Sequence, residues 1–373
     1  MAVTDTDATQ RVEPEPDAAK DPSLSPVHDG SGHLHSPVPA VAHHVHPPAP
    51  EPRETVERPG RGVKLARISR TGDLVFRGLT GSSGGLIVLL VIFVGVFLLA
   101  LALPSLLADK DNFLTSRNWT VSGAELRFGI LSLLWTTVLS SVLAMAMAVP
   151  VAVGVALCLT QYLPKRVSGP VSFVVDLLAA VPSIIFGLWG LTVLGPFLAP
   201  AAEWLIRHLG WIPLFSKGVD PKGTVFVASV VLAMMILPIV TAISRDVFAK
   251  TPRDHVEAAL ALGATRWEMI RTSVLPYGRS GVIAASMLGL GRALGETVAV
   301  MIILTQPAPG SPFSPSIFAG GETFASKIAN NAAEFDSPSK TGAYIAAGLV
   351  LFIVTFAVNA LARIIANRGQ AKS

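Results

Sequence analysis

The sequence predicts an all-α membrane protein that crosses the bilayer with six transmembrane helices. Hydrophobic residues make up 51% of the 373 residues and charged residues only 14%, whereas soluble domains carry about 25% charged residues. The mean hydropathy is +0.57. A water-soluble core cannot hide this much apolar surface, and a single cysteine excludes a disulfide-rich scaffold.

Six apolar stretches are each long enough for a helix to cross the hydrocarbon core, which takes about 20 residues. They are 85–107, 129–160, 170–199, 223–243, 280–304 and 342–362. The second stretch contains Pro150 and the third Pro182. Both are longer than one crossing requires, so we expect kinks, tilts or short surface helices there rather than an additional crossing.

Residues 1–60 differ in composition from the rest of the chain. They include eleven prolines, six of the eight histidines, ten acidic residues and four basic residues. Because this segment has no apolar run to bury, we expect a disordered cytoplasmic tail. His43, His44 and His46 could bind a metal ion, but Cys partners and regular ligand spacing are missing, so no metal site is predicted.

The positions of Lys and Arg predict the orientation. With the N-terminus inside, the inner segments hold sixteen of these residues and the outer loops hold eight. The positive-inside rule therefore places both termini in the cytoplasm of a multi-pass cell membrane protein. We interpret the basic excess as contact with the lipid bilayer and expect no nucleic-acid partner.

These observations divide the chain into four regions. The tail at 1–60 is followed by a region at 61–127 that holds a basic juxtamembrane segment, the first transmembrane helix and the first outer loop. A transmembrane core at 128–366 contains a prominent cytoplasmic loop at 247–277, and a short cytoplasmic tail follows at 367–373.

The loop at 247–277 has the pattern of two short helices. Thr251 can cap the first helix, Pro252 suits its first position, and Gly263 can end it in the left-handed conformation. Thr265 begins a second helix, because Glu268 follows at capping-box spacing. The prediction is a compact helical knob on the cytoplasmic face.

Three charged side chains fall inside the six stretches: Asp176, Arg292 and Glu296. Each costs about 2.5–3.5 kcal/mol at the bilayer centre on insertion scales, so such residues usually face a protein interior or a pathway. Arg292 and Glu296 are four residues apart, which favours an ion pair on one helix face. Arg292 stays cationic and presents paired donors that suit phosphate or carboxylate oxygens.

Two interpretations of this pair stay open at the sequence level. It is either part of a substrate site or a structural clamp between helices, and Gly291 and Gly295 would let another helix approach in both cases. Asp176 either pairs with Arg292 or lies near the inner end of the third stretch.

The knob resembles the EAA loop of ABC importer permeases. The matching residues are Glu257, Ala258, Ala259, Gly263, Leu275 and Pro276, and Ser273 stands where an aliphatic residue is usual. In that family the loop is a coupling helix that docks into a cytoplasmic ATPase. The resemblance implies this coupling role here. The small side chains of Ala258 and Ala259 would allow another protein to approach the knob closely. We expect Pro276 to end or kink the second helix.

The string at 289–297 resembles the signature of phosphate ABC permeases of the PstC type, and 181–190 and 126–162 also resemble phosphate permease sequences. The resemblance covers about residues 85–366. It implies the type I ABC importer permease fold. It also implies a substrate pathway that includes Arg292, Glu296, Thr297, Asp176 and Ser183.

The function that this resemblance implies is half of the membrane pathway of a binding-protein-dependent phosphate importer. The implied partners are a second, PstA-type permease, two ATPase subunits and an extracytoplasmic phosphate-binding protein. The chain has no Gly-x-x-x-x-Gly-Lys-Ser/Thr loop, so ATP and Mg²⁺ would be used by the ATPase subunits. We therefore expect a transport subunit with no catalytic residues and no cofactor of its own.

Three alternatives remain at the sequence level. A single arginine does not distinguish phosphate from other oxyanions. A permease for sulfate or molybdate is therefore the nearest alternative. A secondary anion transporter or channel could also use an Arg–Glu pair, but it would not need the loop at 251–276. An intramembrane hydrolase would need a pair of catalytic groups at membrane depth, whereas His208 and His255 lie in loops.

Overall fold

The computed structural model describes residues 70–121, 125–216, 222–308 and 311–370. The predicted tail at 1–60, the first part of the basic segment at 61–69 and the last residues of the C-terminal tail, 371–373, lie outside the described residues. In the described part the chain is almost entirely helical, as the sequence predicts.

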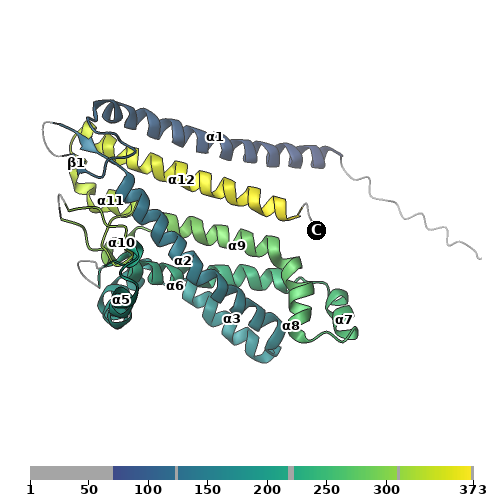
Figure 1. Ribbon diagram of the computed structural model, residues 1–373. Helices are drawn as coiled ribbons and strands as arrows, with labels where there is room; N and C mark the ends of the chain where they lie inside the picture. The colour runs from purple at the N-terminus through teal and green to yellow at the C-terminus, as the bar shows by residue number, and fades with distance from the viewer. Residues whose placement is uncertain (1–69, 122–124, 217–221, 309–310, 371–373) are drawn as a thin grey trace, which may run out of the picture. The chain divides into compact units, whose positions relative to one another are not determined.

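Two long helices at the ends of the described chain run side by side (Figure 1). They are α1 (Arg70–Ala108) and α12 (Pro338–Gln370). Their contact contains small residues, including Ala102, Ala343 and Ala346, and Ser105 Oγ donates to the Ser339 carbonyl at 2.8 Å. Helix α1 begins at the end of the molecule where α12 finishes, because the two helices are antiparallel (Figure 1).

The centre of the fold is the pair α2 (Leu131–Leu157) and α6 (Val225–Phe248). Helix α2 presents a stripe of fully buried alanines at four-residue spacing: Ala144, Ala148, Ala152 and Ala156. Such a stripe lets two helix backbones approach closely. Side chains of α6, such as Val231, Ile236 and Val240, pack in the same buried clusters. A π turn, Cys158–Tyr162, extends α2.

The third predicted stretch, 170–199, is not one helix. It is divided into α3 (Lys165–Ala179), α4 (Ser183–Trp189), a π turn (Gly190–Leu194) and α5 (Gly195–Leu209). The break falls at Pro182, which has an extended backbone with φ −59° and ψ 139°. A proline disfavours helical geometry in the residue before it, so the chain changes direction here.

The fifth predicted stretch, 280–304, is also divided. It forms α9 (Leu275–Gly295) and α10 (Val298–Ile303), with Glu296 extended between them. The loop before α9 forms α7 (Arg253–Ala261) and α8 (Arg266–Met269), and a π turn, Ile270–Val274, joins α8 to α9. We call the end of the molecule that carries α7 and α8 the α7–α8 end.

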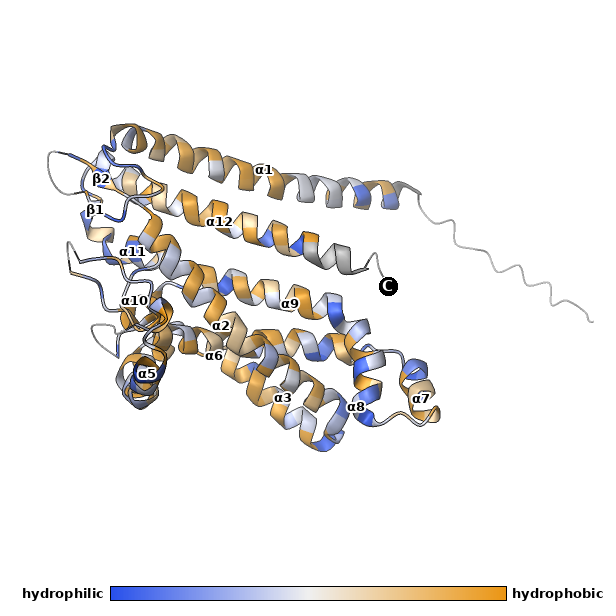
Figure 2. Cartoon of the chain, viewed as in Figure 1, coloured by the Kyte–Doolittle hydropathy of each residue, from blue (hydrophilic) through white to orange (hydrophobic). Residues whose placement is uncertain are grey.

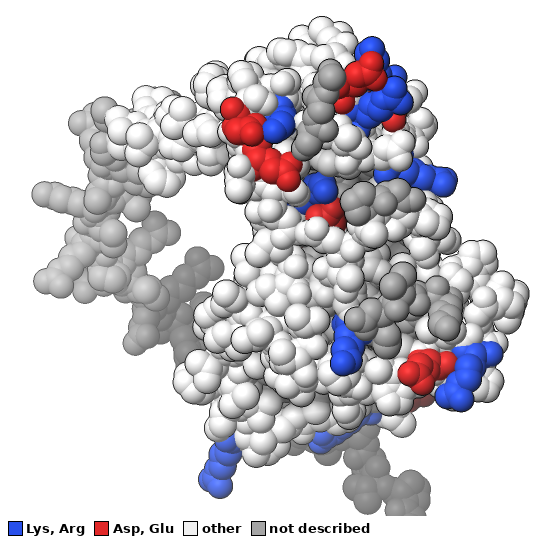
Figure 3. Space-filling view, turned by 90° about the vertical axis from the view of Figure 1, so that its left-hand side faces the viewer, with Lys and Arg blue, Asp and Glu red and all other residues white. Residues whose placement is uncertain are grey.

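The opposite end, which we call the β1–β2 end, holds short elements. Strands β1 (Trp119–Thr120) and β2 (Arg127–Phe128) pair antiparallel, with Trp119 opposite Phe128. The other elements are a 3₁₀ turn (Pro213–Phe215), α11 (Phe324–Asn330) and a second 3₁₀ turn (Ala332–Glu334). Figure 3 shows this end face-on, with acidic and basic side chains next to one another in small groups.

Five helices in the described part of the chain are long and apolar enough to span a membrane on their own. They are Gly72–Ala108, Leu131–Tyr162, Ser183–Leu209, Val225–Phe248 and Pro338–Ile364. Figure 2 shows orange, hydrophobic residues along these helices and bluer residues on α7 and α8. The sixth predicted crossing corresponds to α9 and α10, where Arg279, Arg292 and several glycines lower the hydropathy of α9.

Candidate functional site

Helix α7 begins one residue later than the sequence predicts. Pro252, with φ −57° and ψ 133°, occupies the cap position, and the first helical residue is Arg253. Thr251 belongs instead to the turn that closes α6, since its N–H donates to the Phe248 carbonyl at 3.2 Å. The prediction that Thr251 caps α7 is therefore wrong.

Gly263 ends the α7 segment in the left-handed conformation, as predicted. Its φ is +85°, a region that is costly for residues with a Cβ atom. The N–H of Ala264 donates to the Ala259 carbonyl at 3.2 Å, which closes the helix end. The chain can then turn at once into α8.

The predicted capping box at the start of α8 is confirmed. The Thr265 N–H donates to Glu268 Oε2 at 2.8 Å, and the Glu268 N–H donates to Thr265 Oγ1 at 3.3 Å. The hydrogen bonds from the backbone N–H and the hydroxyl of Thr265 lower the pKa of the Glu268 carboxyl, because they favour its charged form.

The α7–α8 knob has an exposed face and a packed face. Glu257 and Ala258 are exposed on α7, whereas Ala259 packs with Val256 against the buried cluster around Met269 and Ile270. Of the two small residues predicted to admit a partner, Ala258 alone is on the exposed face. Three large apolar side chains of the knob are also exposed: Leu260, Leu262 and Trp267, with Leu262 89% exposed. Exposed apolar patches of this kind usually mark contact sites.

Leu275 and Pro276 do not end the second helix, but its axis bends between α8 and α9, as predicted for a kink near Pro276 (Figure 1). Residues 266–295 form one continuous helix, in which the π turn directly precedes Leu275. The Leu275 N–H donates to the Ile270 carbonyl. Pro276 has no N–H, and it lies where the backbone hydrogen bonds change from the π pattern to the α pattern. Its missing donor therefore does not remove a hydrogen bond from the interior of an α-helix.

Arg292 lies in the last turn of α9 and is exposed. It forms no hydrogen bond and no ion pair with any other described residue. A Cβ atom added to Gly291 or Gly295 would meet nothing within 4 Å. The face of α9 around Arg292 is thus open, and no helix in the described part of the chain packs against these glycines.

The predicted Arg292–Glu296 ion pair is not formed. Helix α9 ends at Gly295, so Glu296 does not continue the helical face on which Arg292 lies. Instead, Glu296 Oε1 accepts the Ala299 N–H at 3.3 Å at the start of α10. Thr297 occupies the cap position of α10, and its hydroxyl donates to the Gly295 carbonyl at 3.2 Å.

Asp176 does not pair with Arg292 either. Its carboxylate lies 3.5 Å from the guanidinium of Arg245 in the last turn of α6, and it is about half exposed. Arg245 also contacts Asp246 at 3.2 Å. Asp176 therefore lies on the α3 side of an ion-pair group that joins α3 to α6, away from the break between α9 and α10.

Ser183 is the first residue of α4, directly after the break at Pro182. One turn further on, a Cβ atom at Gly187 would lie 2.9 Å from Ala299 Cα. Helix α4 is thus in close contact with α10. The parts of the two spans that follow the breaks therefore pack together. The sequence indicates an irregularity at Pro182 but none at Glu296, and it does not indicate the contact between α4 and α10.

The comparisons with known proteins agree with this architecture. The family model for "Binding-protein-dependent transport system inner membrane component" matches residues 148–369. The chain is 54% identical to "Phosphate transport system permease protein PstC 2" of Mycobacterium tuberculosis, over 84% of this chain and 98% of that protein.

Two further relatives carry a similar name. PstC of Mycobacterium leprae is 55% identical over 73% of this chain and 86% of its own length. PstC of Mesorhizobium japonicum is 36% identical over 85% of this chain and 96% of its own length. The family match, the shared length and the bundle of apolar helices with an exposed α7–α8 knob lead to one conclusion. The chain belongs to the family of inner membrane components of binding-protein-dependent transport systems.

Proposed function

We propose that this chain is the permease subunit of an ATP-driven phosphate importer and forms half of the path through which inorganic phosphate enters the cell. The observation that carries the proposal is Arg292, an exposed guanidinium without a counter-charge among the described residues. The similarity to phosphate permeases over most of their length supports phosphate as the anion.

Arg292 is suited to receive phosphate because its guanidinium can donate two parallel hydrogen bonds to anion oxygens. Glu296 does not neutralise it, since that carboxylate caps α10. The extended Glu296 between α9 and α10 interrupts the helix close to Arg292 and frees backbone groups at its end. Asp176 contacts Arg245 instead, so we assign the anion-binding role to Arg292 and a supporting role to Thr297 and Ser183 at the two breaks.

The α7–α8 knob is the proposed docking surface for an ATPase subunit. Glu257, Ala258 and Leu262 are exposed there, and Gly263 and the Thr265–Glu268 capping box fix the turn that presents them. Ala259 and Leu275 support this surface from within the buried cluster, and Pro276 lies exposed at the start of α9. The complete transporter would add a PstA-type permease, two ATPase subunits that use ATP and Mg²⁺, and an extracytoplasmic phosphate-binding protein. This assignment places the α7–α8 end and both chain termini in the cytoplasm.

Replacement of Arg292 tests the proposed pathway. We expect Arg292→Gln to abolish phosphate uptake into membrane vesicles while the protein still inserts into the membrane, because an exposed side chain contributes little to folding. Uptake of radiolabelled phosphate is the measurement, and Arg363→Gln, at an exposed arginine of α12, is the control. Normal uptake by Arg292→Gln would contradict the anion role.

Substrate choice is tested in the same vesicles. We expect excess unlabelled phosphate, and not sulfate or molybdate, to compete with labelled phosphate. Strong competition by sulfate would favour the oxyanion alternative, whereas uptake that continues without ATP would favour a secondary transporter or channel.

Replacement of Glu257 or Gly263 tests the docking surface. Glu257→Ala removes an exposed charge, and Gly263→Ala places a Cβ atom at φ +85°, which costs about 1–2 kcal/mol. We expect both variants to lose ATPase co-purification or substrate-stimulated ATP hydrolysis. Glu203→Ala, an exposed glutamate on α5, should leave both unchanged, and intact coupling in the α7 variants would count against docking here.

A further inference from the structure

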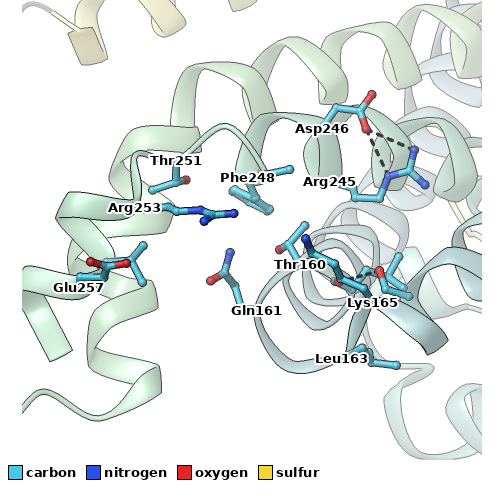
Figure 4. A pocket seen from close by; sticks show the side chains of 14 residues that line it. Thr160, Gln161, Leu163, Lys165, Arg245, Asp246, Phe248, Thr251, Arg253 and Glu257 are labelled. Carbon is cyan, nitrogen blue, oxygen red and sulfur yellow. Dashed lines mark hydrogen bonds and ion pairs between the residues drawn. The ribbon is translucent and has the colours of Figure 1, made fainter.

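A cavity of about 490 Å³ opens at the α7–α8 end. Four elements form its walls: the π turn after α2, the start of α3, the end of α6 and the start of α7 (Figure 4). Of the residues already assigned to coupling or transport, Glu257 alone lines it. The cavity therefore has no part in the pathway proposed for Arg292.

Three cationic side chains line the cavity, and one of them is already matched by carboxylates. Arg245 contacts Asp176 at 3.5 Å and Asp246 at 3.2 Å. Lys165 and Arg253 form no ion pair with any residue in the described ranges. The remaining carboxylate of the lining, Glu257, lies at the edge of the cavity in Figure 4. Lys165 and Arg253 are thus not ion-paired among the described residues, and Glu257, one turn after Arg253 on α7, is the nearest carboxylate to it along the helix.

Neutral polar groups without partners line the same space. Thr251 Oγ1 is buried and has no hydrogen-bond partner among the described residues, which is a costly arrangement for a hydroxyl. The amide of Gln161 has no partner there either, and in Figure 4 it points toward the guanidinium of Arg253. Thr160 differs, because its hydroxyl donates to the Ala156 carbonyl at 2.9 Å.

The two cations that are not ion-paired stand at helix starts. Lys165 is the first residue of α3 and Arg253 is the first residue of α7. A helix start carries a partial positive charge that favours anions. The donors of the cavity therefore come from separate elements, and one acceptor that contacts all of them needs several oxygens. A phosphate group meets this requirement, because its oxygens can accept charge-assisted bonds from guanidinium and ammonium groups together.

We propose that this cavity binds a phosphate group between α3 and α7, either as free inorganic phosphate or as the headgroup of an anionic phospholipid. The bound group connects the α7 part of the knob to the α2–α3 part of the bundle through Arg253 and Lys165. It would hold α7 in place when occupied. The binding itself does not depend on the proposed transport function, because Arg292 does not line the cavity.

The experiment uses the full-length chain carrying Arg292→Gln, so that the proposed pathway cannot contribute. The chain is placed in phosphatidylcholine nanodiscs and titrated with inorganic phosphate by calorimetry. Lipid binding is measured by native mass spectrometry after incubation with phosphatidylglycerol. We expect Lys165→Gln with Arg253→Gln to weaken binding at least about tenfold, since two charge-assisted contacts are lost. Arg166→Gln, at the exposed neighbour of Lys165 that does not line the cavity, should bind as the parent does.

The two ligands distinguish the sources of the phosphate group. Loss of inorganic phosphate binding in the double variant supports free phosphate, and selective loss of phosphatidylglycerol adducts supports a lipid headgroup. Thr251→Val provides a second, nearly isosteric test and should weaken the same ligand. The proposal is wrong if the parent chain binds neither ligand, or if Arg166→Gln loses as much affinity as the double variant. Failure of phosphate uptake by the unmodified chain would instead overturn the proposed transport function alone.

Discussion

At the scale of single residues, Gly187 determines how closely α4 and α10 can pack. A Cβ atom there would lie 2.9 Å from Ala299 Cα and 3.3 Å from Ile302 Cδ1. The nearest atom belongs to the backbone, so a side-chain rotation cannot relieve the contact. The two helices follow the breaks at Pro182 and Glu296, and their contact therefore helps to fix the position of both breaks.

We predict that Gly187→Ala destabilises the protein by about 1–3 kcal/mol, as is typical of overpacking in a dense core. The thermal unfolding midpoint of the purified chain in detergent is the measurement, with phosphate uptake as a second readout. Gly154→Ala on α2 is the matched control, because nothing lies within 4 Å of its added Cβ atom. Equal midpoints for the two variants would show that α4 and α10 are not closely packed.

The sequence was a better guide to which charged residues lie at the site than to which residues those side chains contact. Arg292 was identified as a charged residue inside an apolar stretch, and the structure leaves it exposed. Its expected partner Glu296 caps α10 instead, because a spacing of four residues implies a shared face only within a continuous helix. The partner of Asp176 is Arg245, which is 69 positions away in the chain, and no local pattern indicates such a pairing.

At the scale of elements, the start of α8 depends on an ionised carboxylate. Hydrogen bonds from Thr265 lower the pKa of Glu268 from its ordinary value of 4.5. A carboxyl whose pKa is lower in the folded state stabilises that state above the unfolded pKa, and this contribution is lost as the pH falls through the folded pKa. The capping box should therefore weaken below about pH 4.5.

We predict faster amide hydrogen exchange in α8, relative to the intrinsic rate, as the pH falls from about 5 to 3. Glu268→Gln should remove this pH dependence, because the amide does not titrate in this range. Exchange followed by mass spectrometry is the measurement, and the α2 peptides provide an internal reference. The same pH profile in the parent and the variant would contradict the assigned role of Glu268.

Helix ends were predictable where a local signal determines them. Gly263 and the Thr265–Glu268 capping box were identified from residue type and spacing alone, and α6 lies close to the predicted stretch at 223–243. The break after α9 was missed because no proline stands there, and Gly295, Glu296 and Thr297 lie within an apolar stretch of the length of a single crossing. Contact between α4 and α10 accompanies that break, and tertiary packing of this kind has no signature within one stretch.

At the scale of the whole molecule, charge is distributed very unevenly along the chain. Residues 1–60 carry ten acidic and four basic side chains, whereas the rest of the chain has an excess of basic residues. The family model matches 148–369 and does not include this segment. The transport machinery is therefore expected to lie in the helical part.

We predict that deletion of residues 2–60 leaves phosphate uptake unchanged within about twofold, since a segment without an apolar run is expected to add little to folding. Uptake per inserted molecule in vesicles is the measurement. Deletion of residues 2–84 is the contrasting variant, which should reduce insertion because it removes the basic segment and the start of α1. A loss of transport in the shorter deletion would show that the acidic segment has a role in transport.

The continuous helix from Arg266 to Gly295 has a mechanical consequence. It joins the knob to Arg292 through the π turn at Ile270–Val274 without an intervening loop. Met269 and Arg292 are about 35 Å apart along this helix at 1.5 Å per residue. Because α8 and α9 are joined by helix and not by a loop, a displacement of α8 is passed directly to the start of α9, about 25 Å from Arg292 along that helix. Removal of one residue from the π turn would rotate the knob by about 100° about the α9 axis, so the length of this turn sets the direction in which the knob leaves α9.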